Sequence, residues 1–165
     1  MKKFELTSET KINIFGKKLF RIKALVSFGV VKTGETGGWV EKEENVNQSG
    51  DAWVFGNAEV FGNARVSGDA EVFGNARVSG NAWVSGNAEV FGNADYTTIH
   101  GFGTQFRTTT FFRCKDKQVK VSCGCFYGTI PEFREQVKNT RDGKIAEEYL
   151  MIADLMEKHF AEEAK

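Results

Sequence analysis

The chain has 165 residues, which is enough for one ordinary domain or for one repeat body with caps at its ends. Lysine plus arginine equals aspartate plus glutamate, at 22 each, so no global field favours nucleic acid or an anionic membrane as a partner. No stretch approaches the length of a membrane span, and three cysteines, an odd number, are typical of a reducing compartment. We therefore expect a cytoplasmic protein without a membrane partner, and the balanced charge disfavours nucleic acid.

The first 27 residues are expected to form a β-hairpin that caps one end of the protein. Two isoleucines, Ile12 and Ile14, precede a turn at residues 15–17, and apolar residues then alternate along a second strand, at Phe20, Ile22 and Ala24. Repeat bodies need non-repetitive caps because their open ends would otherwise expose unpaired strands. This hairpin can supply the first cap.

A six-residue unit recurs from Gly50 to Thr97, beginning with GDAWVF and decaying in GNADYT. Alanine and valine alternate with variable residues, which predicts short strands with one buried face, and each Gly-Asn or Gly-Asp pair permits a corner with φ > 0. A hexapeptide period is typical of a parallel β-helix. We assign residues 28–103 to this unit, with an irregular first turn. The step from Val46 to Val54 is eight residues rather than six, so about two residues should bulge at one corner.

The pattern resembles the hexapeptide-repeat proteins of the left-handed β-helix class. In that class an aliphatic residue points inward and a small residue precedes it by two positions. The units here match the aliphatic position at Val54, Val60, Val66, Val72, Val78, Val84 and Val90, and the small position at Ala52, Ala58, Ala64, Ala70, Ala76, Ala82, Ala88 and Ala94. The resemblance implies three units per turn, so residues 18 apart should stack about 4.8 Å from one turn to the next. A left-handed coil would be an exception to the right-handed crossover rule.

With that stacking, the phenylalanines that follow three of the valines form a column on one outer side. Contiguous apolar patches usually contact something. Three possibilities stay open: the chain's own terminal segments cover the column, a second copy covers it in a dimer or trimer, or a foreign partner binds it. The main candidate interface residues are Trp53, Phe55, Phe73 and Phe91, and the secondary candidates are Phe61 and Trp83.

Residues 104–165 are expected to form an α+β cap. GFGTQFRTTTFFRC and KQVKVSCGCFYG alternate like two strands of a hairpin joined around residues 115–117. Thr129 is a candidate helix N-cap, with Glu132 reaching back to it, and a longer helix is expected from about Lys144 to Phe160. The predicted buried residues of the two helices are Phe133, Val137, Ile145, Tyr149, Ile152, Met156 and Phe160. This face should pack on the hairpin or on the phenylalanine column.

Catalytic chemistry has few candidates. Acyltransferases with a similar scaffold use a histidine base on a loop that interrupts the coils; His100 is the candidate here, but no loop interrupts the repeat and no substrate cleft is expected. Cys114, Cys123 and Cys125 could form a Cys3His zinc site with His100. Their C-x8-C-x-C spacing departs from paired zinc ligands and favours core packing instead. We therefore predict no catalytic residue and no cofactor.

A second resemblance is carried by the flanks, in the segments GGWVEKEENV, RTTTFFRCKD, CGCFYGT and EYLMIADLMEKHF. They are similar to a family of phage and prophage proteins of Gram-positive bacteria, usually described as hypothetical or polymer-forming, in which a variable number of GNAxV units lies between such ends. The resemblance implies a phage origin, and phage accessory proteins of this size often act on host machinery. Our leading hypothesis is therefore a non-enzymatic protein-interaction module that acts on a host protein in the bacterial cytoplasm. Inhibition of a defence system, as by an anti-CRISPR, is the sharpest form of this hypothesis. The alternatives are an acyltransferase-like enzyme and a self-assembling structural protein.

Overall fold

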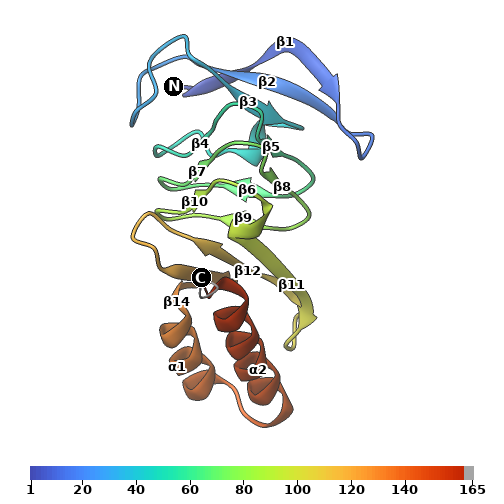
Figure 1. The fold of residues 1–165 in the computed structure, drawn as a ribbon, viewed down its shortest axis with the longest axis vertical. Helices are drawn as coiled ribbons and strands as arrows, with labels where there is room; N and C mark the ends of the chain where they lie inside the picture. The colour runs from blue at the N-terminus through green and yellow to red at the C-terminus, as the bar shows by residue number, and fades with distance from the viewer. Residues whose placement is uncertain (162–165) are drawn as a thin grey trace.

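The computed structural model describes residues 1–161, which form an elongated stack of three parts (Figure 1). An antiparallel hairpin lies at one end, a series of short strands forms the middle, and a sheet carrying two helices lies at the other end. The expected mainly β architecture, with an N-terminal hairpin and two C-terminal helices, is confirmed. Neither helix of residues 1–161 is long and apolar enough to cross a membrane.

The N-terminal hairpin consists of β1 (Phe4–Ile12) and β2 (Lys18–Ala24), and β3 (Thr36–Val40) joins it to the next part. The hairpin starts earlier than the sequence indicated, and its buried side is made by Phe4, Leu19 and Ile22. Ile12 and Ile14 are instead 65% and 74% exposed. The register of β1 shifts between Leu6 and Thr10, and such an irregularity changes which residues face the core.

The middle part contains seven strands of two residues each: β4 (Trp53–Val54), β5 (Glu59–Val60), β6 (Arg65–Val66), β7 (Glu71–Val72), β8 (Arg77–Val78), β9 (Trp83–Val84) and β10 (Glu89–Val90). They belong in rotation to three sheets, and pair in parallel in the orders β4-β7-β10, β3-β5-β8 and β6-β9. The second of these continues antiparallel from β3 into the hairpin, as β1-β2-β3-β5-β8. Val54 pairs with Val72, 18 residues further on, which confirms the expected stacking distance along the chain. We call residues 36–92, which wind through these sheets, the coil.

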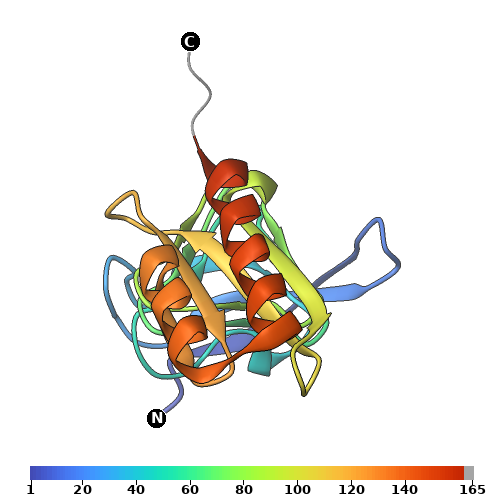
Figure 2. The same cartoon turned by 90° about the horizontal axis from the view of Figure 1, so that it is seen from below.

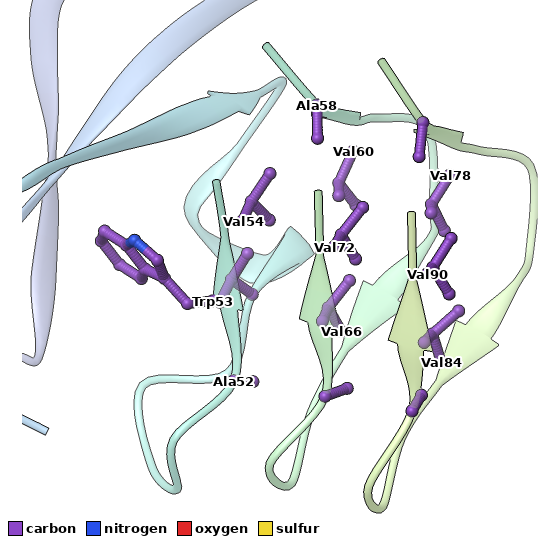
Figure 3. Close-up of a cluster of buried hydrophobic side chains, with 14 of the residues drawn as sticks. Ala52, Trp53, Val54, Ala58, Val60, Val66, Val72, Val78, Val84 and Val90 are labelled. Atoms are coloured by element: carbon purple, nitrogen blue, oxygen red, sulfur yellow. The ribbon is translucent and has the colours of Figure 1, made fainter. Parts of the chain in front are cut away.

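The valines and alanines of the repeat form the interior of the coil (Figure 3). Every valine that matches the aliphatic position is fully buried, and full burial of such a side chain contributes about 1.5–3 kcal/mol. The small position is buried from Ala52 to Ala88, as expected, but Ala94 is exposed. The repeat ends there because residues Asn93–Asp95 form a short 3-10 helix, η2, at the end of the coil.

The irregular first turn is two residues longer than the regular turns, and the additional residues lie between Val46 and Val54, as predicted. Val46 bridges Val66, 20 residues further on, whereas Val54 pairs with a residue 18 further on. A short 3-10 helix, η1 (Glu43–Asn45), occupies this turn. The side chain of Asn45 is buried and donates to the carbonyls of Gly62 and Ala64, at 3.2 and 2.8 Å. These bonds replace the strand pairing that the irregular turn lacks.

The C-terminal part contains an antiparallel sheet of β11 (Tyr96–Phe102), β12 (Arg107–Arg113), β13 (Val119–Cys123) and β14 (Phe126–Thr129). The expected turn at residues 115–117 joins β12 and β13, but the sheet has four strands rather than two. Gly124, at φ 59°, lets the second predicted strand fold back on itself as β13 and β14. Residues 96–102, which we assigned to the repeat unit, pair with β12 in this sheet.

The two faces of this sheet have different neighbours. Toward the coil, Phe112 joins the coil core and Thr110 Oγ1 accepts a hydrogen bond of 3.0 Å from the backbone N–H of Trp83. Toward the helices α1 (Ile130–Thr140) and α2 (Gly143–Phe160), Phe111 and Val121 pack against the helical core (Figure 2). The sheet therefore closes the end of the coil and supports the helices at the same time.

Both helices agree with the sequence. Thr129 is the N-cap of α1, where its hydroxyl accepts from the backbone N–H of Glu132 at 3.3 Å. The predicted faces of both helices are buried or half-buried against the C-terminal sheet. They form a separate core from that of the coil and include none of the phenylalanines of the column. The helices therefore do not cover the column.

Substitution of two glycines tests how the corners hold the coil. Gly68 and Gly80 have the same left-handed φ, 65° and 66°, so alanine at either position should cost about 1–2 kcal/mol in strain. A Cβ at Gly68 would also lie 2.9 Å from the backbone nitrogen of Gly86, whereas a Cβ at Gly80 meets open space. We expect Gly68→Ala to reduce the free energy of unfolding by about 1 kcal/mol or more beyond Gly80→Ala in urea titrations. Equal losses of unfolding free energy in the two variants would show that the close contact between Gly68 and Gly86 does not add to the cost of substitution.

Candidate interaction surface

Phe55, Phe73 and Phe91 form a stacked column, which we call the Phe column, on the outside of the β4-β7-β10 sheet. The ring centroids of Phe55 and Phe73 are 4.6 Å apart with planes inclined by 8°, and those of Phe73 and Phe91 are 4.8 Å apart at 16°. The parallel register places each ring directly over its equivalent one turn earlier. Phe91 is 56% exposed, and the other two rings are half-buried. The predicted apolar column is therefore present and accessible.

Charged side chains border the Phe column. Glu71 and Glu89 are neighbours across β7 and β10, and their like charges repel. Lys115, from the turn after β12, relieves this by pairing with Glu71 at 3.2 Å, and its backbone N–H donates to Asn87. A hollow of about 340 Å³ opens at the end of the column, lined by Glu89, Phe91, Asp95, Arg113, Cys114 and Lys117. The column thus has an acidic border and a basic turn beside it.

Trp53 does not belong to this accessible surface, which corrects the sequence-based prediction. Its indole points out of the coil but is only 1% exposed. Phe4 and Phe28 meet it edge-on, with ring centroids 5.8 and 5.2 Å away. The N-terminal segments therefore cover this end of the β4-β7-β10 sheet and bury Trp53 as part of the cap (Figure 3).

Phe61 is also covered, which is a second correction. It is 7% exposed and forms a small core with Leu19 and Trp39. The ring of Phe15, from the hairpin turn, lies 5.7 Å from that of Phe61. The turn of the hairpin folds against the side of the coil, so Phe61 contributes to attaching the cap rather than to an external contact.

A buried carboxylate fastens the same hairpin. Glu59 is 5% exposed, and its carboxylate accepts from Lys11 at 3.0 Å, from Arg77 at 3.5 Å and from the side-chain amide of Asn13 at 3.2 Å. Lys11 and Asn13 belong to the hairpin, whereas Arg77 belongs to the coil strand next to Glu59. The carboxylate therefore joins the cap to the coil. The contacts of Glu59 with the hairpin have no signal in the sequence, because Lys11 and Asn13 are far from Glu59 in the chain.

Trp83 lies on a different side of the coil. It is 43% exposed, and its indole N–H donates to Ser67 Oγ at 3.0 Å, which fixes the ring on the β6-β9 sheet. A groove of about 400 Å³ separates it from the irregular first turn, with Glu43, Glu44 and Arg65 among its lining residues. Trp83 is thus accessible, but it is not continuous with the Phe column.

The three cysteines do not come together, so the candidate zinc site is wrong. Cys114 faces the coil core and bridges Ala88, whereas Cys123 lies on the opposite, helix-facing side of the same sheet. Cys125 is exposed in the turn between β13 and β14. Within residues 1–161 no group of three or more metal-binding side chains is found. Burial, with a smaller contribution from the Asp116 carboxylate, raises the pKa of the Cys114 thiol to about 12.

His100 lies on β11 and is exposed, with Nδ1 at 3.0 Å from the hydroxyl of Thr108 on the neighbouring strand. No loop interrupts the coil between Gly50 and Val90, as the sequence indicated. Thr108 is the one hydrogen-bond partner of this imidazole within residues 1–161, so no second polar group orients the ring as a catalytic base.

No family model and no curated protein matches the chain. The function is therefore argued from the geometry. The accessible apolar features in residues 1–161 that the sequence singled out are the Phe column and Trp83, and only the Phe column is contiguous over three turns. Sequence reasoning missed Lys115 beside the column, because nothing local to the β12–β13 turn indicates that it reaches the coil.

Replacing the buried carboxylate tests how the hairpin is held. Glu59→Gln would leave Lys11 and Arg77 without their counter-charge, and we expect a loss of about 1–3 kcal/mol in the free energy of unfolding. Glu71→Gln is a matched control, since Glu71 is less buried and has one ion pair. Urea unfolding of both variants measures the difference. A loss no greater than that of the control would contradict the fastening role of Glu59.

The thiols should differ strongly in reactivity. With a pKa of about 12, only about 10⁻⁴ of Cys114 is thiolate at pH 8, and the side chain is also buried. We expect iodoacetamide at pH 8 to alkylate Cys125 in the folded protein and to leave Cys114 unmodified until urea unfolds the chain. Peptide mass spectrometry measures both sites. Rapid modification of Cys114 in the folded state would disprove its placement in the coil core.

Proposed function

We propose that this chain is a non-enzymatic protein-interaction module that binds a partner protein through the Phe column. The observation that carries the proposal is a contiguous stack of three aromatic rings, with Phe55 and Phe73 half-buried and Phe91 exposed, that does not belong to the core of the C-terminal helices. Aromatic side chains are enriched at the energetic centres of protein interfaces. Contiguous apolar surface on a monomer marks a site of contact.

The coil holds this surface rigidly. The first two rings are anchored to the next turn, since Phe55 N–H donates to Val72 and Phe73 N–H to Val90, both at 2.8 Å, and Phe91 N–H donates to the Asp95 carboxylate at 2.8 Å. Rings that are already stacked lose little freedom on binding, so less of the binding free energy is spent on ordering them. Three rings alone cover less than a standard interface of about 1,200–2,000 Å². The partner therefore also contacts the border of Glu71, Glu89 and the Lys115 turn, where charge would select it.

The proposal includes the handedness of the scaffold, a left-handed parallel β-helix. The six-residue period, the rotation of successive strands through three sheets and the parallel pairing of equivalent units support a three-sided parallel coil, and its left hand is proposed from the resemblance alone. The resemblance to hexapeptide-repeat proteins rests on the same units.

The partner in this proposal is a host bacterial protein, and the chain is phage-encoded and acts in the host cytoplasm. The support is the resemblance of its flanking segments to phage and prophage proteins, since no residue of the Phe column identifies the partner. The most specific form of the proposal is an inhibitor of a host defence system, similar in role to an anti-CRISPR.

Serine substitution of the column tests the proposal without removing the scaffold. The repeat already carries serine at the equivalent position of other units, at Ser67, Ser79 and Ser85, so the triple variant Phe55→Ser, Phe73→Ser, Phe91→Ser should keep the coil. We expect the tagged protein to capture a stoichiometric host protein, and the triple variant to lose it. With the purified partner, Phe91→Ser alone should weaken binding about tenfold or more in calorimetry.

Trp83→Ser is the matched control, because it removes an exposed aromatic from another side of the coil. It should bind as the unchanged protein does. Sedimentation velocity of all three proteins identifies the competing possibility: a trimer or open-ended assembly that the triple variant abolishes would assign the column to self-association. A folded triple variant that binds the partner normally would overturn the proposal.

A further inference from the structure

The C-terminal cap contains a second feature, independent of the Phe column. Two adjoining hollows, of about 170 and 100 Å³, share the side chains of Arg107, Cys123, Arg141 and Tyr149. Their lining residues come from the β11–β12 turn, the β13–β14 turn, the end of α1 and the first half of α2. We call these two hollows together the arginine cavity.

The two arginines carry positive charge into the cavity without a carboxylate. Within residues 1–161, neither Arg107 nor Arg141 makes an ion pair; Arg107 donates to the amide oxygen of Gln105 at 2.6 Å and Arg141 to the carbonyl of Thr140 at 3.1 Å. Arg77, Arg113 and Arg134 are paired with carboxylates, whereas Arg21 and Arg65, like the two arginines of the cavity, have no ion pair within residues 1–161. Two guanidinium groups close together repel, and a bound anion would relieve that repulsion.

Arg107 and Arg141 both influence the pKa of the Tyr149 hydroxyl. Burial raises the pKa of this phenol, and the Cys123 thiol adds to the effect, while Arg141 and Arg107 both act in the opposite direction. Glu148 also lies near the phenol, but its carboxylate pairs with Lys144 at 3.6 Å. Arg107 and Arg141, both exposed, each line both hollows.

The backbone around the cavity is shaped for these side chains. Gly124 has φ 59°, and a Cβ there would overlap the guanidinium of Arg107, which lies directly on the turn. Gly103 has φ 78°, and a Cβ there would lie 2.5 Å from the Tyr149 hydroxyl. Phe106, which directs Arg107, has φ 53°, a conformation that is strained for an aromatic residue. Three residues in the left-handed region thus hold the cavity in its form.

We propose that the arginine cavity binds a phosphoryl group, either as free phosphate or as a small phosphate monoester. Guanidinium groups bind phosphate oxygens bidentately, and two of them match the charge of a dianion. Thr140 and Gln136 line the same hollow and supply further polar contacts. Drug-sized ligands need about 300–1,000 Å³, so the cavity admits the phosphoryl group and leaves any ester substituent outside.

The cysteines of the cavity provide a local measurement. Cys125 is exposed and lines the hollow together with Cys123. An anion held by Arg107 and Arg141 would occupy the hollow that Cys125 lines and would block the approach of a reagent to its sulfur. Alkylation of Cys125 should therefore slow when the site fills.

The test measures the rate of Cys125 alkylation by iodoacetamide with increasing inorganic phosphate, glycerol 2-phosphate or chloride, at constant ionic strength and pH. We expect a saturable decrease of threefold or more with phosphate and none with chloride. If the ester acts as strongly as the free ion, the ligand enters as a monoester; if only phosphate acts, the ligand is the free anion.

Arg107→Gln and Arg141→Gln should each abolish the effect, and Arg134→Gln is the matched control, since its guanidinium pairs with Asp154 on the helices. Circular dichroism establishes that each variant is folded, and calorimetry of phosphate binding to the unchanged protein gives a second readout. A labelling rate that phosphate leaves unchanged, or a decrease that persists in both arginine variants, would overturn the proposal.

Discussion

The parallel pairing of strands, which sets residues 18 apart beside each other, is the interaction on which the rest of this structure depends. It places equivalent positions of successive units directly over one another, so one pattern repeated along the chain becomes a column in space. The inward valines become a continuous core, and the outward phenylalanines become the Phe column. The register of the strands is sufficient to impose both arrangements. The glycines at the corners make that register possible, because they adopt the positive φ that each corner requires.

A coil of this kind has two open ends, and closing them decides which of its surfaces stay accessible. The N-terminal hairpin covers Trp53 and Phe61 and is fastened through Glu59, so outward aromatics near that end become core. The C-terminal sheet instead closes the other end from below, with Phe112 in the coil core. The Phe column lies between these two caps, and its exposure results from where they stop.

The C-terminal sheet has a coil on one face and helices on the other, and this accounts for much of the local chemistry. Cys114 and Cys123 lie on opposite faces, so a shared metal ion has no place, and Cys114 is held as an inert buried thiol. At one end of the sheet, Arg107 and Arg141, which have no ion pair within residues 1–161, line the same hollow as Cys123 and Cys125. The proposed interaction surface and the arginine cavity are therefore in different parts of the molecule and are separable by mutation.

The sequence by itself determined what depends on local repetition. The 18-residue stacking, the two-residue bulge after Val46, the N-cap at Thr129 and the buried faces of both helices follow from spacing and turn residues, because each involves neighbours in the chain or in the same repeat. Only the tertiary structure decided the burial of Trp53 and Phe61, the pairing of residues 96–102 with β12 and the separation of the cysteines. Those outcomes depend on how the caps dock, and docking joins surfaces that are far apart in the chain and have no shared period to reveal them.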